Sequence, residues 1–201
     1  MAEPVEDGQN SNPNRNLMRI GVFKIVKIRT IKDFPENQHE EIRNGGKIIL
    51  PESVLHKLNG GIVIPSPFIL KIVSGKRHVM CGVISFSGQN GHASVPEWVM
   101  KQLHVTANTC VTLYVLLKSL AKGERVLVQP LSTKFLDITD PKAVLERSLR
   151  NFACLTKNDT LNISYNNLIH PVLISDTKPD HTINIIDCDL VVDFIGMSVI
   201  L

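Results

Sequence analysis

The side chains that could ligate a metal ion or act as nucleophiles are widely spaced in this sequence. His78 and Cys81 are separated by two residues, a spacing found among zinc ligands, but no second pair of ligands accompanies them. The cysteines are Cys81, Cys110, Cys154 and Cys188; none forms a CxxC pair, and each lies among apolar residues. We therefore expect four buried, reduced thiols and no metal site.

Motifs of the large enzyme classes are also missing from the sequence. Gly75-Lys76 lacks the upstream glycine and the following serine or threonine of a phosphate-binding P-loop. The sequence contains no HExxH, no GxSxG, and no Asp-Thr-Gly or Asp-Ser-Gly tripeptide. Backbone N–H groups at residues 45–47 could hold an anion, but a turn before a strand is the simpler interpretation. The sequence therefore predicts no catalytic residue and no cofactor.

A mixed acidic and apolar surface is predicted near the C-terminus, where residues 182–194 have the pattern of one strand. Alternation places one set of side chains on the outer face: Ile185, Asp187, Asp189, Val191 and Asp193. The opposite, core-facing set is Ile186, Cys188, Leu190, Val192 and Phe194. The outer face would complement a partner whose apolar patch is ringed by Lys and Arg. The alternative is an ordinary solvated strand face.

The composition favours strands as the elements that position these residues. The chain has 21 Ile and 20 Val but only 6 Ala, and β-branched side chains pack better on sheets than in helices. Its 43% hydrophobic and 20% charged residues are typical of a folded domain. A net charge of +3 and 5% aromatic residues argue against nucleic-acid binding, despite the basic side chains on a first strand at residues 21–31. No stretch is long and apolar enough for membrane insertion.

An internal repeat predicts the architecture of the first half of the chain. Residues 50–58 and 95–103 share the pattern apolar-Pro-Glu-x-Val-apolar-x-x-Leu, in which a strand enters a short helix. Each helix has one predicted apolar face, comprising Val54, Leu55 and Leu58 in the first unit and Val99, Met100 and Leu103 in the second. Two such units, each flanked by further strands, indicate a pseudo-twofold double-psi β-barrel. Residues 33–46 are expected to form a polar loop.

A second subdomain is predicted after a polar boundary at residues 118–125. Asp140 and Pro141 are suited to begin a helix that extends to Phe152, and strands are predicted at 125–131, 160–165, 168–174 and 182–194. The fold class is therefore β-rich α+β. The expected divisions are a disordered tail at 1–19, a barrel subdomain at 20–118, an α+β subdomain at 125–195 and a tail end at 196–201.

Several segments of the sequence resemble the ubiquitin fusion degradation protein 1 family. They are residues 45–51 (GGKIILP), 81–83 (CGV), 96–100 (PEWVM), 135–146 (FLDITDPKAVLE), 149–156 (LRNFACLT), 177–180 (TKPD) and 186–194 (IDCDLVVDF). The resemblance covers roughly residues 20–194 and implies a fold like the N-terminal domain of the valosin-containing AAA ATPase.

The resemblance also implies a non-catalytic adaptor that binds ubiquitin and polyubiquitin chains. Family members pair with nuclear protein localisation protein 4 and recruit ubiquitinated clients to the valosin-containing AAA ATPase for unfolding and proteasomal degradation, including clients retrieved from the endoplasmic reticulum. Contacts with these two partners are expected in the C-terminal part of the family, beyond the region matched here. On this interpretation residues 185–193 are the candidate ubiquitin site, and the expected localisation is the cytoplasm and nucleus. An enzyme with an unrecognised active site on the same barrel is the alternative function.

Overall fold

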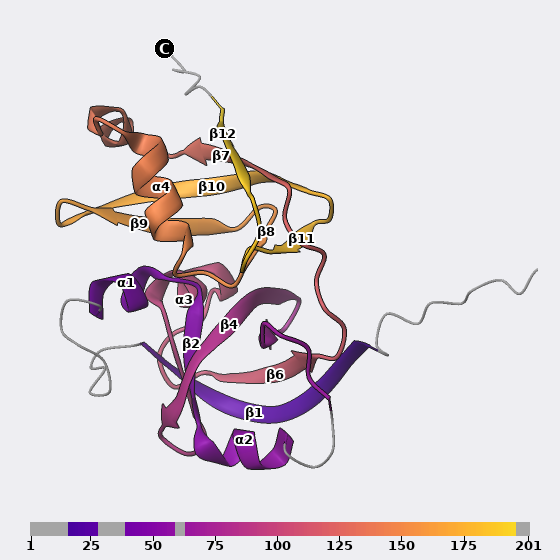
Figure 1. The fold of residues 1–201 in the computed structure, drawn as a ribbon. Coiled ribbons are helices and arrows are strands. Elements are labelled where there is room, and N and C mark those ends of the chain that lie inside the picture. Colours follow the sequence, from indigo (N-terminus) through magenta and orange to yellow (C-terminus); the bar gives the residue numbers. More distant parts are fainter. Residues whose placement is uncertain (1–15, 28–38, 59–62, 196–201) are drawn as a thin grey trace, which may run out of the picture.

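The computed structural model describes residues 16–27, 39–58 and 63–195. The predicted tail end at 196–201 lies outside the described residues, as do residues 1–15 of the predicted tail at 1–19. Residues 17–19 of that predicted tail belong instead to the first strand of the barrel. Figure 1 shows two bodies stacked on each other: a barrel below, and a sheet crossed by one helix above. No helix in the described part of the chain is long and apolar enough to span a membrane.

The lower body is a closed six-stranded barrel with the strand order β1-β5-β2-β4-β3-β6. Its strands are β1 (Leu17–Lys27), β2 (Lys47–Pro51), β3 (Ile69–Ser74), β4 (Arg77–Gly88), β5 (His92–Val95) and β6 (Cys110–Leu116). β1 pairs in parallel with β5, and β2 pairs in parallel with β4, while the remaining neighbours are antiparallel. The barrel and the smaller body above it confirm the predicted fold class.

The strand–helix repeat is also confirmed. β2 runs directly into α2 (Glu52–Leu58), β5 runs into α3 (Glu97–Leu103), and the two strands lie side by side in the barrel. The side chains buried on the two helices are Val54 and Leu58 on α2, and Trp98, Val99 and Leu103 on α3. Leu55 is exposed, so its predicted place on the buried face of α2 is wrong. The buried face of this short helix is narrower than predicted.

The predicted loop at residues 33–46 contains a helix, α1 (His39–Asn44). The expectation of a loop at His39 and Glu40 is therefore wrong. The physical reason is the packing of Ile42, whose side chain is 7% exposed and contacts Ile49 of the barrel. This contact stabilises a short helix, which the polar composition of the segment did not indicate.

The upper body contains a four-stranded sheet of order β12-β7-β10-β9, a two-stranded sheet of β11 and β8, and one longer helix. Its elements are β7 (Arg125–Pro130), a 3₁₀ helix η3 (Thr133–Asp137), α4 (Pro141–Leu149), β8 (Cys154–Thr156), β9 (Thr160–Tyr165), β10 (Leu168–Lys178), β11 (Thr182–Asn184) and β12 (Val191–Phe194). α4 ends three residues before the predicted end at Phe152.

The start of α4 was predicted correctly, because Asp140 caps it by accepting a hydrogen bond from the backbone N–H of Ala143 at 3.0 Å. We predict that Asp140→Ala lowers the free energy of unfolding by about 1 kcal/mol, the usual effect of losing an N-cap side chain. Urea unfolding measures this change in the free energy of unfolding. Asp137→Ala removes a nearby exposed carboxylate as a control, and equal losses for the two variants would contradict the capping role.

The predicted continuous strand at residues 182–194 is wrong. β11 pairs with β8 in one sheet and β12 pairs in parallel with β7 in the other, and residues 185–190 form a turn between them. Asp187 in this turn has a φ of 50°, a left-handed conformation that interrupts a strand. The alternation assumed across the whole segment therefore applies only within each short strand.

The two bodies meet at a tightly packed junction around Phe152. The Phe152 side chain lies against the backbone of Gly46, where an added Cβ would approach Phe152 Cδ1 to 2.2 Å, and its ring centroid is 6.1 Å from that of Trp98. Trp98 Nε1 donates to Gly45 O at 2.8 Å. Gly46 N also donates to Asn151 O at 3.1 Å. The glycines at 45–46 thus serve the junction between the subdomains, where the Gly45 carbonyl and the Gly46 N–H and carbonyl groups are hydrogen-bonded within the protein.

The cysteines only partly match the expectation of four buried thiols. Cys81 and Cys154 are buried, whereas Cys188 is half-buried and Cys110 is exposed at the start of β6. The expectation that Cys110 is buried is therefore wrong. Cys110 is the first residue of β6 and its side chain lies on the outer surface, although its neighbours in the sequence are apolar.

Candidate functional site

The five residues of the predicted acidic and apolar face are distributed over a turn and an edge strand. Asp187 and Asp189 are exposed in the turn, and Val191, which begins β12, is 55% exposed. Ile185 is half-buried and packs against the core. Asp193 forms an ion pair with Arg125 of the neighbouring strand β7, so its charge is partly neutralised.

Three of the five predicted residues line one groove, which we name the α4–β12 groove. It has a volume of about 520 Å³ and lies between the second half of α4 and the segment from Ile185 to Val192. Its lining comprises Glu146, Leu149, Arg150, Ile185, Cys188, Asp189, Leu190, Val191 and Val192. Asp187 and Asp193 are outside this lining.

The lining of the α4–β12 groove combines apolar and charged side chains. Exposed Val191 and the half-buried Ile185 and Leu190 supply apolar area, and exposed Asp189 and Glu146 place carboxylates at its rim. Burial raises the pKa of the Cys188 thiol, so this side chain stays neutral there. The groove can therefore accept an apolar patch with a basic margin.

The loop that carries Asp187 and Asp189 is held in place by the boundary between the subdomains. Lys122 Nζ donates to the backbone oxygen of Asp187 at 2.7 Å, and Gly123 N donates to Asn184 O at 2.8 Å. At Gly123 an added Cβ would lie 2.8 Å from Ile183 Cδ1, so only glycine fits without rearrangement. These contacts order the turn that presents the two carboxylates.

Sequence reasoning missed the half of the groove that comes from α4. Glu146, Leu149 and Arg150 are about 40 residues away from the acidic segment in the sequence and approach it only because α4 lies across the sheet. Their helical spacing indicated an amphipathic helix, but no signal in the sequence indicated which segment they would face.

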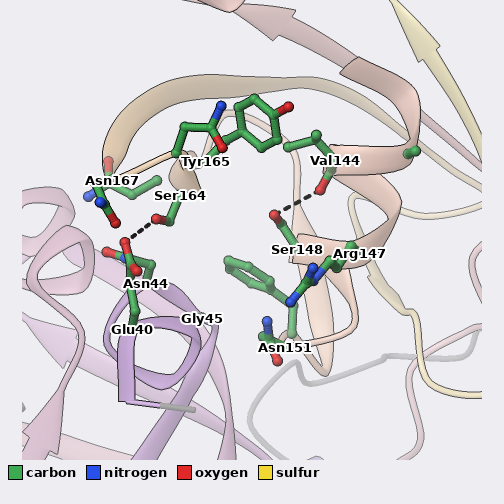
Figure 2. A pocket seen from close by; sticks show the side chains of 14 residues that line it. Glu40, Asn44, Gly45, Val144, Arg147, Ser148, Asn151, Ser164, Tyr165 and Asn167 are labelled. Atoms are coloured by element: carbon green, nitrogen blue, oxygen red, sulfur yellow. Dashed lines mark hydrogen bonds between the residues drawn. The ribbon is translucent and has the colours of Figure 1, made fainter. Parts of the chain in front are cut away.

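A second groove lies between the subdomains and is shown in Figure 2. This inter-subdomain groove has a volume of about 640 Å³, with walls from α1, α4 and the end of β9. Its lining comprises Glu40, Asn44, Gly45, Ala143, Val144, Arg147, Ser148, Asn151, Phe152, Asn162, Ser164, Tyr165, Asn166 and Asn167. Ser164 Oγ donates to Glu40 Oε1 at one side of the groove. Five asparagines are among the lining residues.

Neither groove contains a catalytic arrangement among the described residues. No group of three or more His, Cys, Asp and Glu side chains there is placed to hold a metal ion. His78 is exposed, whereas Cys81 lies in the barrel core, so the two do not converge. The strongly perturbed carboxyl is Asp159, which lines neither groove: burial raises its pKa to about 7, although a hydrogen bond from Gln102 Nε2 at 2.9 Å lowers it.

Comparison with protein families assigns both halves of the chain. Residues 21–119 match the family model described as Ubiquitin fusion degradation protein UFD1, N-terminal subdomain 1, and residues 122–197 match N-terminal subdomain 2 of the same protein. The chain belongs to the ubiquitin fusion degradation protein 1 family. The first match contains the barrel from residue 21 onward, and the second contains α4 and the sheet, so the α4–β12 groove lies within subdomain 2 of this family.

Curated relatives in distant organisms agree with this assignment. The human Ubiquitin recognition factor in ER-associated degradation protein 1 is 40% identical over 159 residues, which are 79% of this chain and 51% of the relative. The Dictyostelium discoideum Ubiquitin fusion degradation protein 1 homolog is 39% identical over 167 residues, 82% of this chain and 49% of the relative. The Saccharomyces cerevisiae Ubiquitin fusion degradation protein 1 is 38% identical over 155 residues, 75% of this chain and 42% of the relative. The chain thus spans about half the length of these curated relatives.

Proposed function

We propose that this chain is a non-catalytic ubiquitin-recognition module and that the α4–β12 groove is its contact site. The observation that carries the site is the convergence of exposed Val191, half-buried Ile185 and the carboxylate of Asp189 on one groove. The name of the human relative, a ubiquitin recognition factor, supports ubiquitin as the ligand.

The groove has features that suit a small folded partner. Its apolar residues lie beside carboxylates from both walls, which favours a partner with an apolar patch and neighbouring Lys or Arg side chains. Linked domains bind more tightly than a single domain through effective concentration. We therefore expect polyubiquitin chains to bind more tightly than a single ubiquitin.

The recruiting role belongs to the same proposal. In it, the module presents ubiquitinated clients to the valosin-containing AAA ATPase together with nuclear protein localisation protein 4, in the cytoplasm and nucleus. The name of the human relative, with its reference to ER-associated degradation, supports this pathway. The alternative is an enzyme on the same barrel; among the described residues, no cluster of three or more His, Cys, Asp or Glu side chains that could hold a metal ion favours it.

The α4–β12 groove is tested by the double variant Asp189→Lys/Val191→Asp. The first substitution reverses a carboxylate charge at the rim of the groove, and the second replaces an exposed apolar side chain with a charged one. We expect the Kd for ubiquitin to rise by roughly tenfold or more. Asp187 is left unchanged because its backbone is in the left-handed conformation, where a substitution could strain the turn as well as change the charge. Titration of labelled chain with ubiquitin and with polyubiquitin gives the Kd.

Asp137→Lys is the matched control, since it reverses one exposed charge on η3 outside both grooves. If the double variant binds ubiquitin as tightly as the control does, the α4–β12 groove is the wrong site. If the unaltered chain binds neither ubiquitin nor polyubiquitin, the proposed recognition function is wrong.

A further inference from the structure

The barrel wall is strongly biased toward positive charge. Between Glu52 and Glu124 the sequence has seven Lys and Arg residues but one acidic residue, Glu97, which is already paired with Lys101 of α3 at 3.3 Å. The six barrel strands, within their described bounds, contain no Asp or Glu. Residues 124–195 have ten acidic and seven basic side chains. The net charge of +3 therefore conceals a basic barrel beneath a more acidic upper body.

The strand register brings basic side chains from separate strands onto one outward face of the barrel. β6 lies between β1 and β3, and Tyr114 of β6 stands opposite Arg19 of β1 on one side and Lys71 of β3 on the other. Leu113 and Val115, the neighbours of Tyr114 along β6, are fully buried in the core. Because side chains alternate along a strand, the row of Tyr114, Arg19 and Lys71 points outward.

The next outward rows of the same face contain apolar side chains and a further cation. Thr112 of β6 stands opposite Val22 of β1 and Val73 of β3, and Cys110 of β6 stands opposite Lys24 of β1. Val22 is 50% exposed, and Val73 is half-buried. Apolar side chains therefore lie between cations on a continuous surface of three strands.

The cations of this face have no acidic partner within the described part of the chain. Arg19 and Lys24 are exposed, Lys71 is half-buried, and none of the three forms an ion pair with a described residue. Partial burial lowers the pKa of the nearby His78, and the charges of Lys71 and His181 lower it further. Positive charge thus accumulates here without compensation. We name this surface the basic barrel face, which comprises Arg19, Val22, Lys24, Lys71, Val73 and Tyr114.

We propose that the basic barrel face binds an acidic segment of a partner protein, in which an apolar side chain lies between two carboxylates. The carboxylates pair with the cations of the face, and the apolar side chain covers the exposed Val22. This site belongs to the first subdomain and shares no residue with the α4–β12 groove. It therefore goes beyond the proposed ubiquitin function.

The spacing of the cations sets the spacing of the carboxylates. Arg19 and Lys71 are separated by two strand spacings, roughly 10 Å, and Arg19 and Lys24 by five residues of β1, roughly 15 Å. An extended segment rises about 3.3 Å per residue, so carboxylates about three to five residues apart reach two of these cations. The expected segment thus has two Asp or Glu residues at this separation with an apolar residue between them.

A protein segment suits this face better than a nucleic acid does. Duplex DNA carries one negative charge per about 1.7 Å of helix axis, and tight binding requires many neutralised phosphates. The face presents three Lys or Arg side chains, and the exposed Val22 would meet phosphates that offer it no apolar contact. A protein segment supplies both carboxylates and apolar atoms. Charge complementarity together with the apolar rows therefore favours an acidic peptide.

The test uses a phage-displayed library of random decapeptides selected against the full chain. Enriched peptides are synthesised with a fluorescent label, and their Kd is measured by polarisation. In Arg19→Glu/Lys24→Glu, both substitutions are at exposed positions, so urea unfolding should be little changed. We expect the double variant to raise the Kd by roughly tenfold or more, because attractive contacts become repulsive. The Kd for the unaltered chain should also rise with salt, which screens exposed charges.

Two further variants and two modified peptides serve as matched controls. Lys134→Glu/Lys142→Glu makes the same change in net charge at exposed positions of the upper body and should leave the Kd nearly unchanged. Arg19→Lys/Lys24→Arg keeps both charges and should bind normally. Replacing the peptide carboxylates by amides should abolish binding, and replacing the apolar residue by serine should weaken it.

Cys110 gives an independent measurement that needs no substitution. Its exposed side chain stands opposite Lys24, at the margin of the basic barrel face, whereas half-buried Cys188 lies in the upper body. A bound peptide should slow the alkylation of Cys110 by iodoacetamide and leave the rate at Cys188 unchanged. Mass spectrometry of the digested protein gives both rates in one sample.

Several outcomes would overturn the proposal. The library could enrich no acidic peptide, Arg19→Glu/Lys24→Glu could bind as tightly as the upper-body control, or Cys110 could react equally fast with and without peptide. Loss of peptide binding in Asp189→Lys/Val191→Asp would place the peptide in the α4–β12 groove instead. A short DNA duplex that binds more tightly than the peptides, or self-association of the chain, would assign the face to a nucleic acid or to a second copy if Arg19→Glu/Lys24→Glu abolished it.

Discussion

Phe152→Ala is expected to lower the free energy of unfolding by about 3–5 kcal/mol, the usual cost of removing a fully buried aromatic side chain. Phe152 is 2% exposed and fills the junction between the barrel and the upper sheet. It contacts Gly46 on one side and Trp98 on another, so its removal leaves a cavity where the two subdomains meet. Urea unfolding followed by Trp98 fluorescence reports both the stability and the junction.

A matched pair of variants makes this prediction specific to the Gly46 contact. Gly46→Ala places a Cβ about where Phe152 Cδ1 lies and should destabilise the unaltered chain, whereas the same change should be nearly neutral in Phe152→Ala, where space is available. The double-mutant cycle therefore predicts a favourable coupling between the two substitutions. Additive effects would show that Phe152 does not occupy the space above Gly46.

Asp159→Asn is expected to stabilise the protein near neutral pH and to leave it nearly unchanged near pH 4. Burial raises the pKa of the folded-state carboxyl to about 7, against 3.8 for the ordinary group. The folded state then binds one more proton than the unfolded state between these values, so the free energy of unfolding falls as the pH rises from about 4 to 7. The three-unit difference corresponds to as much as about 4 kcal/mol.

The amide variant cannot ionise and lacks this dependence, while its Oδ1 can still accept from Gln102 Nε2. Urea unfolding of both proteins at several pH values between 4 and 8 isolates the contribution, because all other titrating groups are shared. Asp137→Asn, at an exposed position, is the control. Parallel stability curves for Asp159→Asn and the unaltered chain would show that Asp159 titrates normally.

The junction around Phe152 and Asp159 also sets the geometry of the inter-subdomain groove. Phe152 and Asn151 form part of that groove, and Gln102 joins α3 to the segment just before β9. α1 and α4 both contribute residues to the lining of that groove, so the junction holds two of its walls together.

Local patterns in the sequence were sufficient for the elements that depend on neighbouring residues. The excess of Ile and Val over Ala indicated a β-rich fold, and the repeat at 50–58 and 95–103 indicated two strand–helix units. Asp140 and Pro141 marked the start of α4 because a helix N-terminus is stabilised by side chains adjacent in sequence. α1 was missed because its formation depends on the packing of Ile42 against the barrel.

The sites depended on contacts between distant segments, which only the tertiary structure decided. The alternation at 182–194 suggested one two-faced strand, but the left-handed turn at Asp187 sends its halves into different sheets. Arg150 and Asp189 line one groove, and α1 contacts β9, because of how α4 and β9 pack, and no local spacing encodes such approaches. Residue types and periods specify which faces are apolar or charged, whereas the choice of partner for each face is a global packing result.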